Sequence, residues 1–161
     1  MSADVRNLLC AVSPEDTEGA VLDRAIPLAG QLHARLHVVS VIDDEREKSV
    51  VEVDSHVPAE ALERYHQERA ERVRSCIDAL IAEARAAHPD RVFDNVVSEV
   101  VVREGDDAAQ LVLDEAHRVS ADLIVLGSHQ TSSLLGRLFG SVTHEVASMA
   151  GIPVLLVPTR P

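Results

Sequence analysis

The chain of 161 residues contains 15 basic and 27 acidic residues, which give a formal net charge of −12. Its length predicts one domain, residues 1–161, that is large enough to bury a core. The negative charge argues against nucleic acid and against an anionic membrane surface as partners, since both attract basic proteins. Hydrophobic residues make up 46% of the chain but aromatic residues only 2%. Aliphatic side chains must therefore fill the core, as in helices packed on a parallel sheet.

Cysteine usage and hydropathy indicate the compartment. Cys10 and Cys76 are expected to be small buried hydrophobic residues in a reducing environment. The N-terminus lacks the apolar segment of a signal peptide, and no apolar stretch approaches the roughly 18 residues of a membrane span. These features predict a cytoplasmic protein.

Short apolar runs alternate with segments of helical periodicity from the N-terminus onward. A buried strand is expected over residues 8–12, and a turn follows at Ser13 because the next residue is proline. Apolar residues at helical spacing predict a helix that begins near Thr17, its candidate N-cap, and reaches Leu32. The β-branched run at residues 36–42 predicts a second strand.

A charged segment, residues 43–58, leads into a long predicted helix over residues 59–88. The stripe expected to face the core of this helix contains Leu62, Tyr65, Arg69, Val73, Cys76, Ile77, Leu80, Ile81 and Ala84. A third strand is predicted over residues 93–102, where valines alternate with polar residues as at a sheet edge. A turn at residues 103–106 ends it.

The last part of the chain repeats the alternation twice. Asp107 begins a third helix in the pattern of a capping box with Gln110. The bulky apolar run at residues 123–126 predicts a buried fourth strand. A final helix over residues 141–150 leads to a fifth strand at residues 154–157.

This order of elements predicts a three-layer α/β/α domain with a five-stranded parallel sheet and helices on both faces. Crossovers are right-handed, so the winding has to reverse once to cover both faces. With the reversal between the first and fourth strands, the strand order is 3-2-1-4-5, a Rossmann-like or flavodoxin-like arrangement. Ligands of such sheets bind at the carboxyl ends of the strands that flank the reversal.

The end of the fourth strand and the start of the last helix carry the features of an anion site. Gly127, directly after the apolar run, would let a ligand approach the backbone closely. Gly140 and Ser141 would offer unpaired N–H groups at the helix start, and the Ser141 hydroxyl is a further donor. Ser141 could equally be an N-cap, a role that is compatible with phosphate binding.

Other chemistries are poorly represented in the sequence. Gly140 and Ser141 are not combined with the lysine of a Walker A motif, and no G-x-G-x-x-G run occurs. The eight histidines form no H-E-x-x-H motif and pair with no cysteine. Neither a metal site nor a catalytic residue is therefore predicted.

Five stretches together resemble the universal stress protein family: the first strand with its turn and residues 102–106, 121–129, 138–143 and 152–157. The family's nucleotide-binding members carry a glycine, two residues, a glycine, nine residues, a glycine and then Ser or Thr. Gly127, Gly140 and Ser141 match this pattern in identity and spacing. Gln130 replaces the second glycine, and Ser13 stands where the family usually has Asp.

The resemblance implies a site for ATP or another adenine nucleotide, with or without Mg2+. It implies that the ribose approaches Ser13 and Gly127 and that the phosphates rest on the start of the last helix, while Val41 lies beside the adenine. His129 and Arg137 could reach a phosphate, although such residues are more often simply solvated. The implied nucleotide-binding residues are Val12, Ser13, Val41, Val102, Leu126, Gly127, Ser128, His129, Gln130, Arg137, Gly140, Ser141 and Val142.

The two departures from the family pattern differ in weight. Gln130 would cost roughly 1–2 kcal/mol if its backbone had to be left-handed. Each charge-assisted hydrogen bond between a phosphate and Gly140 or Ser141 contributes about 1.5–3 kcal/mol, so the phosphate end outweighs the lost glycine. Ser13 lacks the carboxylate that would accept a ribose hydroxyl or hold a metal ion. Weaker or less metal-dependent binding is expected, and not its loss.

The resemblance also implies a homodimer formed through the last strand, whose apolar edge otherwise lacks cover. The residues of this interface are Val154, Leu155, Leu156 and Val157. The leading hypothesis is an ATP-binding regulatory protein of the stress response. One alternative is a nucleotide-free dimeric interaction module, which Ser13 and Gln130 favour. Another is a slow ATPase or self-phosphorylating protein, for which the motif supplies no obvious base.

Overall fold

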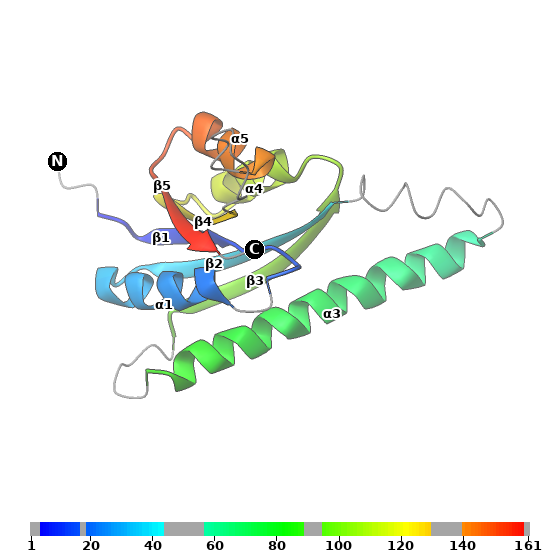
Figure 1. Ribbon diagram of the computed structural model, residues 1–161, viewed down its shortest axis with the longest axis horizontal. Coiled ribbons are helices and arrows are strands. Elements are labelled where there is room, and N and C mark those ends of the chain that lie inside the picture. Colours follow the sequence, from blue (N-terminus) through cyan, green and yellow to red (C-terminus); the bar gives the residue numbers. More distant parts are fainter. Residues whose placement is uncertain (1–3, 17–18, 44–56, 89–94, 130–139, 160–161) are drawn as a thin grey trace.

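A computed structural model describes residues 4–16, 19–43, 57–88, 95–129 and 140–159. In this part of the chain, parallel strands form a five-stranded sheet in the order β3-β2-β1-β4-β5, and helices cover both of its faces (Figure 1). The strands are β1 (Asn7–Ala11), β2 (Arg35–Asp43), β3 (Val97–Gly105), β4 (Leu123–His129) and β5 (Val154–Thr159). The helices are α1 (Ala20–Leu32), α3 (Ala59–Ala86), α4 (Ala108–Arg118) and α5 (Ser141–Met149). The predicted fold class is confirmed, including the reversal of winding between β1 and β4.

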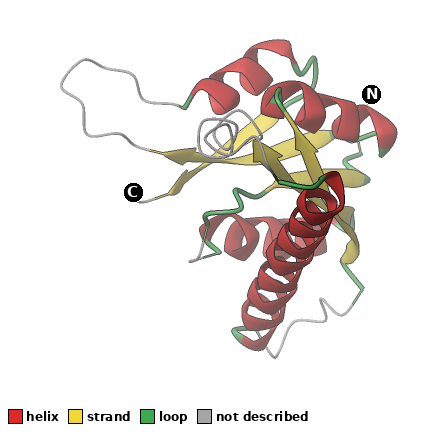
Figure 2. Ribbon diagram, turned by 90° about the vertical axis from the view of Figure 1, so that its right-hand side faces the viewer, coloured by secondary structure: helices red, strands yellow, loops and turns green. Residues whose placement is uncertain are grey.

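Each face of the sheet packs against its own pair of helices, as Figure 2 shows. Helices α1 and α3 cover the face that carries Leu8 and Val38, whereas α4 and α5 cover the face that carries Leu9 and Val39. Successive side chains of a strand point to opposite faces, so the central strands have to be apolar at every position. This requirement explains why continuous aliphatic runs marked the strands in the sequence.

Strands β2 to β5 are longer at their carboxyl ends than the apolar pattern predicted, whereas β1 ends at Ala11, one residue earlier than predicted. Residues 103–105, predicted as a turn, belong to β3 and pair with residues 41–43 of β2. In the same way residues 127–129 of β4 pair with residues 157–159 of β5. Backbone hydrogen bonds extend these strands through polar residues. A pattern of hydrophobic residues cannot reveal such extensions. The position of β3 at the sheet edge is as predicted.

Helix α3 is longer than the strands that it covers. Its 28 residues span about 42 Å, compared with about 30 Å for a nine-residue strand. The helix therefore projects beyond the sheet (Figure 1), and its buried residues are confined to the C-terminal part: Ile77, Leu80, Ile81 and Ala84. The prediction was wrong for Leu62 and Tyr65, which are 37% and 41% exposed, and for Cys76, which is exposed.

The other cysteine meets the prediction. Cys10 lies in β1 and is fully buried, and this burial raises the pKa of its thiol, which therefore stays protonated. The N-cap of α1 is Gly19, so the prediction of Thr17, which itself lies outside the described residues, was wrong. Residues 44–56 of the charged segment also lie outside the described residues. Within the described residues, no helix has the length and hydropathy needed to cross a membrane.

Candidate functional site

Strands β1 and β4 separate at the point where the winding reverses. Their pairing ends at Ala11 and Leu126. The Val12 amide then donates to the Val39 carbonyl at 2.9 Å, so the chain after β1 stays beside β2 and leaves β4. Residues that follow β1 and residues at the end of β4 therefore lie at the same edge of the sheet, the one formed by the carboxyl ends of its strands. Ligands bind at this edge in folds of this class.

Helix α5 begins at this edge without a side-chain cap. Its N-cap is Gly140, whose backbone is extended (φ −62°, ψ 159°). The Gly140 carbonyl accepts the first helical bond, from the His144 amide at 3.0 Å. The amides of Ser141 and Val142 have no acceptor inside the helix, and no side chain in the described part of the chain supplies one. These amides and the positive end of the helix dipole can receive an anion.

Two other helices that begin at this edge use carboxylates of the chain itself. At the start of α1, the Gly19 amide donates to the Asp16 carboxylate at 3.0 Å. At the start of α4, the Asp107 carboxylate accepts from the Gln110 amide at 2.9 Å, which confirms the predicted N-cap. The side chain of Gln110 bonds to Asp114 (2.7 Å). Helix α1, like α5, has no side-chain cap on its first-turn amides, but it begins beside Asp16 and carries Asp23 in its first turn. The first turn of α5 has neither a cap nor an acidic residue.

The first turn of α5 is attached to β4 by a threonine that the sequence analysis did not identify. Thr143 is 8% exposed, and its Oγ1 donates to the Gly127 carbonyl at 3.0 Å. On the other side of β4, the Thr159 hydroxyl of β5 donates to the Ser128 carbonyl at 3.1 Å. The end of β4 is therefore fixed by hydroxyl groups from α5 and from β5. In the sequence, the only signal of this arrangement was a threonine near the start of the last helix and another at the end of the last strand.

The surroundings of the two predicted site glycines differ in whether they explain the absence of a side chain. A Cβ atom on Gly127 would lie 3.1 Å from side-chain methyl groups of both Val21 and Thr159. The packing of α1 and β5 therefore favours a glycine at that position, since a larger residue would displace these methyl groups by a few tenths of an ångström. A Cβ atom on Gly140 would meet no described atom within 4 Å, and the φ angle there suits any residue. The described chain gives Gly140 no internal reason to be a glycine.

Ser13 lies directly after β1 and is half-buried. Its Oγ accepts a hydrogen bond from the Glu15 amide at 3.2 Å, so one lone pair is used and the hydroxyl proton remains a donor. The preceding carbonyl, of Val12, accepts from the Ser40 hydroxyl at 2.8 Å, which holds the end of β1 against β2. Ser13 can thus exchange hydrogen bonds with a ligand but brings no negative charge.

The remaining predicted residues are spread across the sheet. Val12 and Leu126 are buried on opposite faces, so only their backbone can serve a ligand. Val41 is half-buried on the α4–α5 side of β2, while Val102 lies on the edge strand β3, two strands away from β1. Ser128 is buried in β4, and His129 pairs with Thr159. Gln130 and Arg137 lie outside the described residues.

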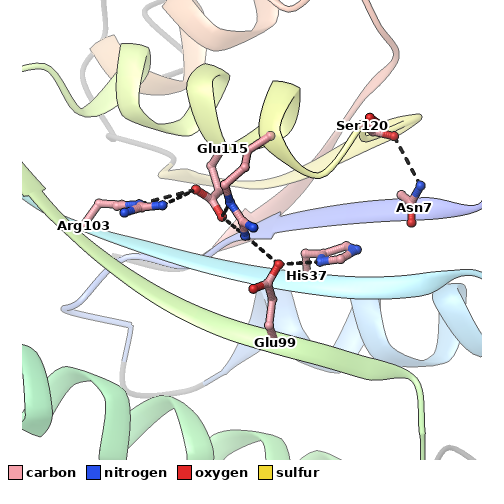
Figure 3. A network of polar contacts seen from close by, with 7 residues as sticks. Asn7, His37, Glu99, Arg103, Glu115 and Ser120 are labelled. Atoms are coloured by element: carbon pink, nitrogen blue, oxygen red, sulfur yellow. Dashed lines mark hydrogen bonds and ion pairs between the residues drawn. The ribbon is translucent and has the colours of Figure 1, made fainter.

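A separate network of charged residues joins α4 to β2 and β3 (Figure 3). Glu115 of α4 is 3% exposed and accepts hydrogen bonds from Arg103 (Nη2, 3.0 Å) and Arg118 (Nε, 2.8 Å). Arg118 also binds Glu99 of β3, which in turn pairs with Nδ1 of His37 at 3.0 Å. Because these residues contact one another across α4, β2 and β3, the network orients α4 on the sheet.

The arginines determine the charge state of both carboxyl groups. Burial of the Glu115 side chain raises its pKa, but hydrogen bonds from Arg118 and Arg103 outweigh this effect and hold the pKa below its ordinary value. A hydrogen bond from Arg118 likewise lowers the pKa of Glu99. Both carboxylates are therefore ionised at neutral pH. No cluster of three His, Cys, Asp or Glu side chains in the described part of the chain is placed to hold a metal ion.

Comparison with known proteins identifies relatives along nearly the whole chain. Residues 4–158 match the model of the universal stress protein family. Universal stress protein YxiE of Bacillus subtilis is 27% identical over 155 residues, which cover 93% of this chain and 97% of YxiE. Stress response protein NhaX of Bacillus subtilis is 36% identical over 80 residues. That match covers 50% of this chain and 46% of NhaX, so it extends over about half of each protein.

Solved structures of this family share the fold. Universal stress protein UspA from Lactobacillus plantarum has a TM-score of 0.66 at 22% identity, covering 96% of this chain and 99% of UspA. A universal stress protein in complex with cAMP has a TM-score of 0.59 at 20% identity, with coverages of 98% and 99%. The Archaeoglobus fulgidus protein in complex with dAMP has a TM-score of 0.56 at 18% identity, with coverages of 96% and 98%.

Proposed function

This chain belongs to the universal stress protein family, and from this premise we propose that it binds an adenine nucleotide, with ATP as the leading candidate, where β1 and β4 separate. The observation that carries the proposal is the uncapped start of α5 at that edge of the sheet. Two solved proteins of similar fold are in complex with cAMP and with dAMP. These complexes support an adenine mononucleotide as the minimal ligand. The proposed role is regulatory, in the response to stress.

In this proposal the phosphates bind to the amides of Gly140, Ser141 and Val142. Each charge-assisted hydrogen bond contributes about 1.5–3 kcal/mol, and the helix dipole adds about 0.3–1 kcal/mol. These local terms have to offset the repulsion of a chain whose net charge is −12. A start of α5 that carries no carboxylate of its own suits that task better than the starts of α1 and α4 do.

In the same proposal the ribose contacts Ser13 and the backbone at Gly127, and the adenine lies beside Val41. Ser13 has one lone pair engaged by the Glu15 amide, so it offers less to ribose hydroxyl groups than a carboxylate would. A Mg2+ ion would depend mainly on phosphate oxygens, since the described chain has no metal-holding cluster. Moderate affinity with little metal dependence is expected.

We extend the proposal to a homodimer that pairs through β5. This strand is one of the two outer strands of the described sheet, and Leu155 on it is 41% exposed. An apolar edge strand of this kind is a template for pairing with another chain. A second copy would pair along Val154, Leu155, Leu156 and Val157 and cover the exposed Leu155, whereas the Val157 side chain is 7% exposed and already belongs to the core.

The experiment that tests the nucleotide site uses calorimetric titration with ATP, AMP and adenosine, together with a Gly140→Val variant. The valine side chain would project where the phosphates meet the backbone, so we expect nucleotide affinity to collapse. The fold should survive, because a Cβ at this position meets no described atom within 4 Å. The melting temperature should fall only modestly, since valine is a poorer N-cap than glycine. Unchanged ATP affinity in a folded Gly140→Val variant would reject the phosphate position.

A nucleotide-free dimeric module is the second candidate function, and the missing carboxylate at Ser13 is the observation that favours it. The same titration separates the two functions. If millimolar ATP and AMP produce neither heat nor a shift in melting temperature, nucleotide binding is rejected. Mass spectrometry of small molecules released from the denatured protein then provides the complementary check, since a co-purified nucleotide would identify the physiological ligand.

A further inference from the structure

We infer that Thr143 is the positioning residue of the phosphate site: its hydroxyl fixes the first turn of α5 to the end of β4 and so determines where the amides of Ser141 and Val142 lie. The inference rests on the proposed function, because those amides are the groups that would hold the phosphates. Thr143 acts through them and through the Gly127 carbonyl, and it is not assigned a contact with the ligand itself.

The contact that supports this assignment joins two parts of the proposed site directly. Thr143 Oγ1 lies 3.0 Å from the Gly127 carbonyl oxygen. Gly127 follows the last β4 residue that pairs with β1, whereas Thr143 is two residues after Ser141. One hydrogen bond thus connects the strand end assigned to the ribose with the helix start assigned to the phosphates.

The bond adds direction to the apolar packing that holds helix α5. Thr143 and Val146 are the buried residues of the nine in the helix, and Val142 packs partly buried against the same core. Apolar packing supplies most of the attraction but is non-directional. A hydrogen bond constrains both distance and angle. The Thr143 hydroxyl is therefore the group best placed to fix the rotation and height of the first turn.

Thr159 provides a closely matched control for Thr143. Both threonines are 8% exposed, and each donates its hydroxyl to a β4 carbonyl at about the same distance: 3.0 Å to Gly127 and 3.1 Å to Ser128. Thr159, however, belongs to β5. Substitution by valine removes the same atom in each case, but only Thr143→Val releases the start of α5.

The test compares ATP with adenosine, because the ratio of their affinities isolates the phosphate contribution. In Thr143→Val we expect ATP affinity to fall about fivefold to tenfold, the weakening of about one hydrogen bond between a displaced amide and the phosphates. Adenosine affinity should stay within about twofold. Thr143→Ser should restore the ratio, and Thr159→Val should preserve it. An unchanged ratio in Thr143→Val, or an equal fall in Thr159→Val, would overturn the assignment.

Hydrogen exchange of the ligand-free protein tests the positioning separately from nucleotide binding. The first hydrogen-bonded amides of α5, which begin with the bond from the His144 amide to the Gly140 carbonyl, should exchange faster in Thr143→Val than in Thr159→Val, although both variants lose a buried hydroxyl. Equal exchange in the two variants would overturn the role of Thr143. If the unaltered chain gives no heat with either ligand, the proposed function fails, and the exchange comparison still decides whether this hydroxyl fixes the helix.

Discussion

Helices α4 and α5 pack side by side on one face of the sheet, yet the chain secures them in opposite ways. Helix α4 has a carboxylate cap at Asp107 and a buried Glu115 that binds two arginines. Helix α5 has Gly140 as its N-cap, without a side-chain bond, and one hydroxyl link through Thr143. In α4 the Gln110 amide and the Glu115 carboxylate find partners within the chain, whereas the amides of Ser141 and Val142 in α5 have no acceptor among the described residues. This difference separates a structural helix from one that is suited to a ligand.

The largest expected effect comes from giving α5 the same kind of cap as α4. In Gly140→Asp, the extended backbone suits an N-cap and the new side chain meets no described atom close by. Its carboxylate would bind the amides proposed for the phosphates. We expect ATP affinity to fall by about 3–6 kcal/mol, the value of two charge-assisted bonds. Stability should rise by a few tenths of a kcal/mol, since aspartate caps slightly better than glycine.

The control for that variant is Ser148→Asp, which adds the same charge near the other end of α5, at an exposed position. Titration should show ATP affinity within about twofold of the unaltered chain, because screening weakens interactions between exposed charges beyond about 10 Å. If Gly140→Asp binds ATP as well as Ser148→Asp does, the phosphates do not lie at the start of α5, and the contrast with α4 has no functional meaning.

The next effect concerns α4 and stability. The double variant Arg103→Met, Arg118→Met leaves the Glu115 carboxylate buried without either partner. We expect the free energy of unfolding to fall by about 3 kcal/mol, at the low end for a broken buried pair because both arginines are 44% exposed. Urea titration measures the change. The matched control, Arg72→Met with Arg74→Met, removes two exposed arginines of α3 and should change stability by less than about 0.5 kcal/mol.

The sequence predicted the sheet well and the polar contacts poorly, for one physical reason. A strand such as β1 is buried on both faces, so residues 8–12 are apolar without interruption and mark it unambiguously. Glu115 and Arg103 look like solvated surface residues in the sequence. Their pairing depends on how α4 packs against β3, which no local pattern encodes. Thr143 escaped notice in the same way, because its acceptor lies 16 residues earlier in the chain.

Helical periodicity failed for a different reason. The stripe through Leu62 and Tyr65 continues the one that contains Ile77 and Leu80, but the sheet ends before the helix does. Periodicity gives the face of a helix and not the extent of the surface that it covers. At the site, Gly140 and Ser141 were found from their spacing, and their geometry agrees with a role at an anion. The assignment of a nucleotide to them stays a prediction.

The smallest effect concerns pH and again separates α4 from α5. Arginine hydrogen bonds hold the pKa values of Glu115 and Glu99 below the ordinary 4.5 in the folded protein. Above pH 4.5 both carboxylates are ionised in either state, so the network contributes its full stability. As the pH falls below 4.5, the unfolded chain binds protons first, and the contribution is lost as the pH passes through the folded-state pKa values. The stability difference between the unaltered chain and the Arg103→Met, Arg118→Met variant should therefore shrink in acid, measured by urea titration at pH 7, 5 and 3.5.

The Thr143→Val variant provides the opposite expectation. A neutral hydroxyl bond does not titrate, so the loss of stability in this variant should persist across the same pH range. A deficit of the double-arginine variant that stays constant down to pH 3.5 would mean that ionised Glu115 does not hold α4 in place.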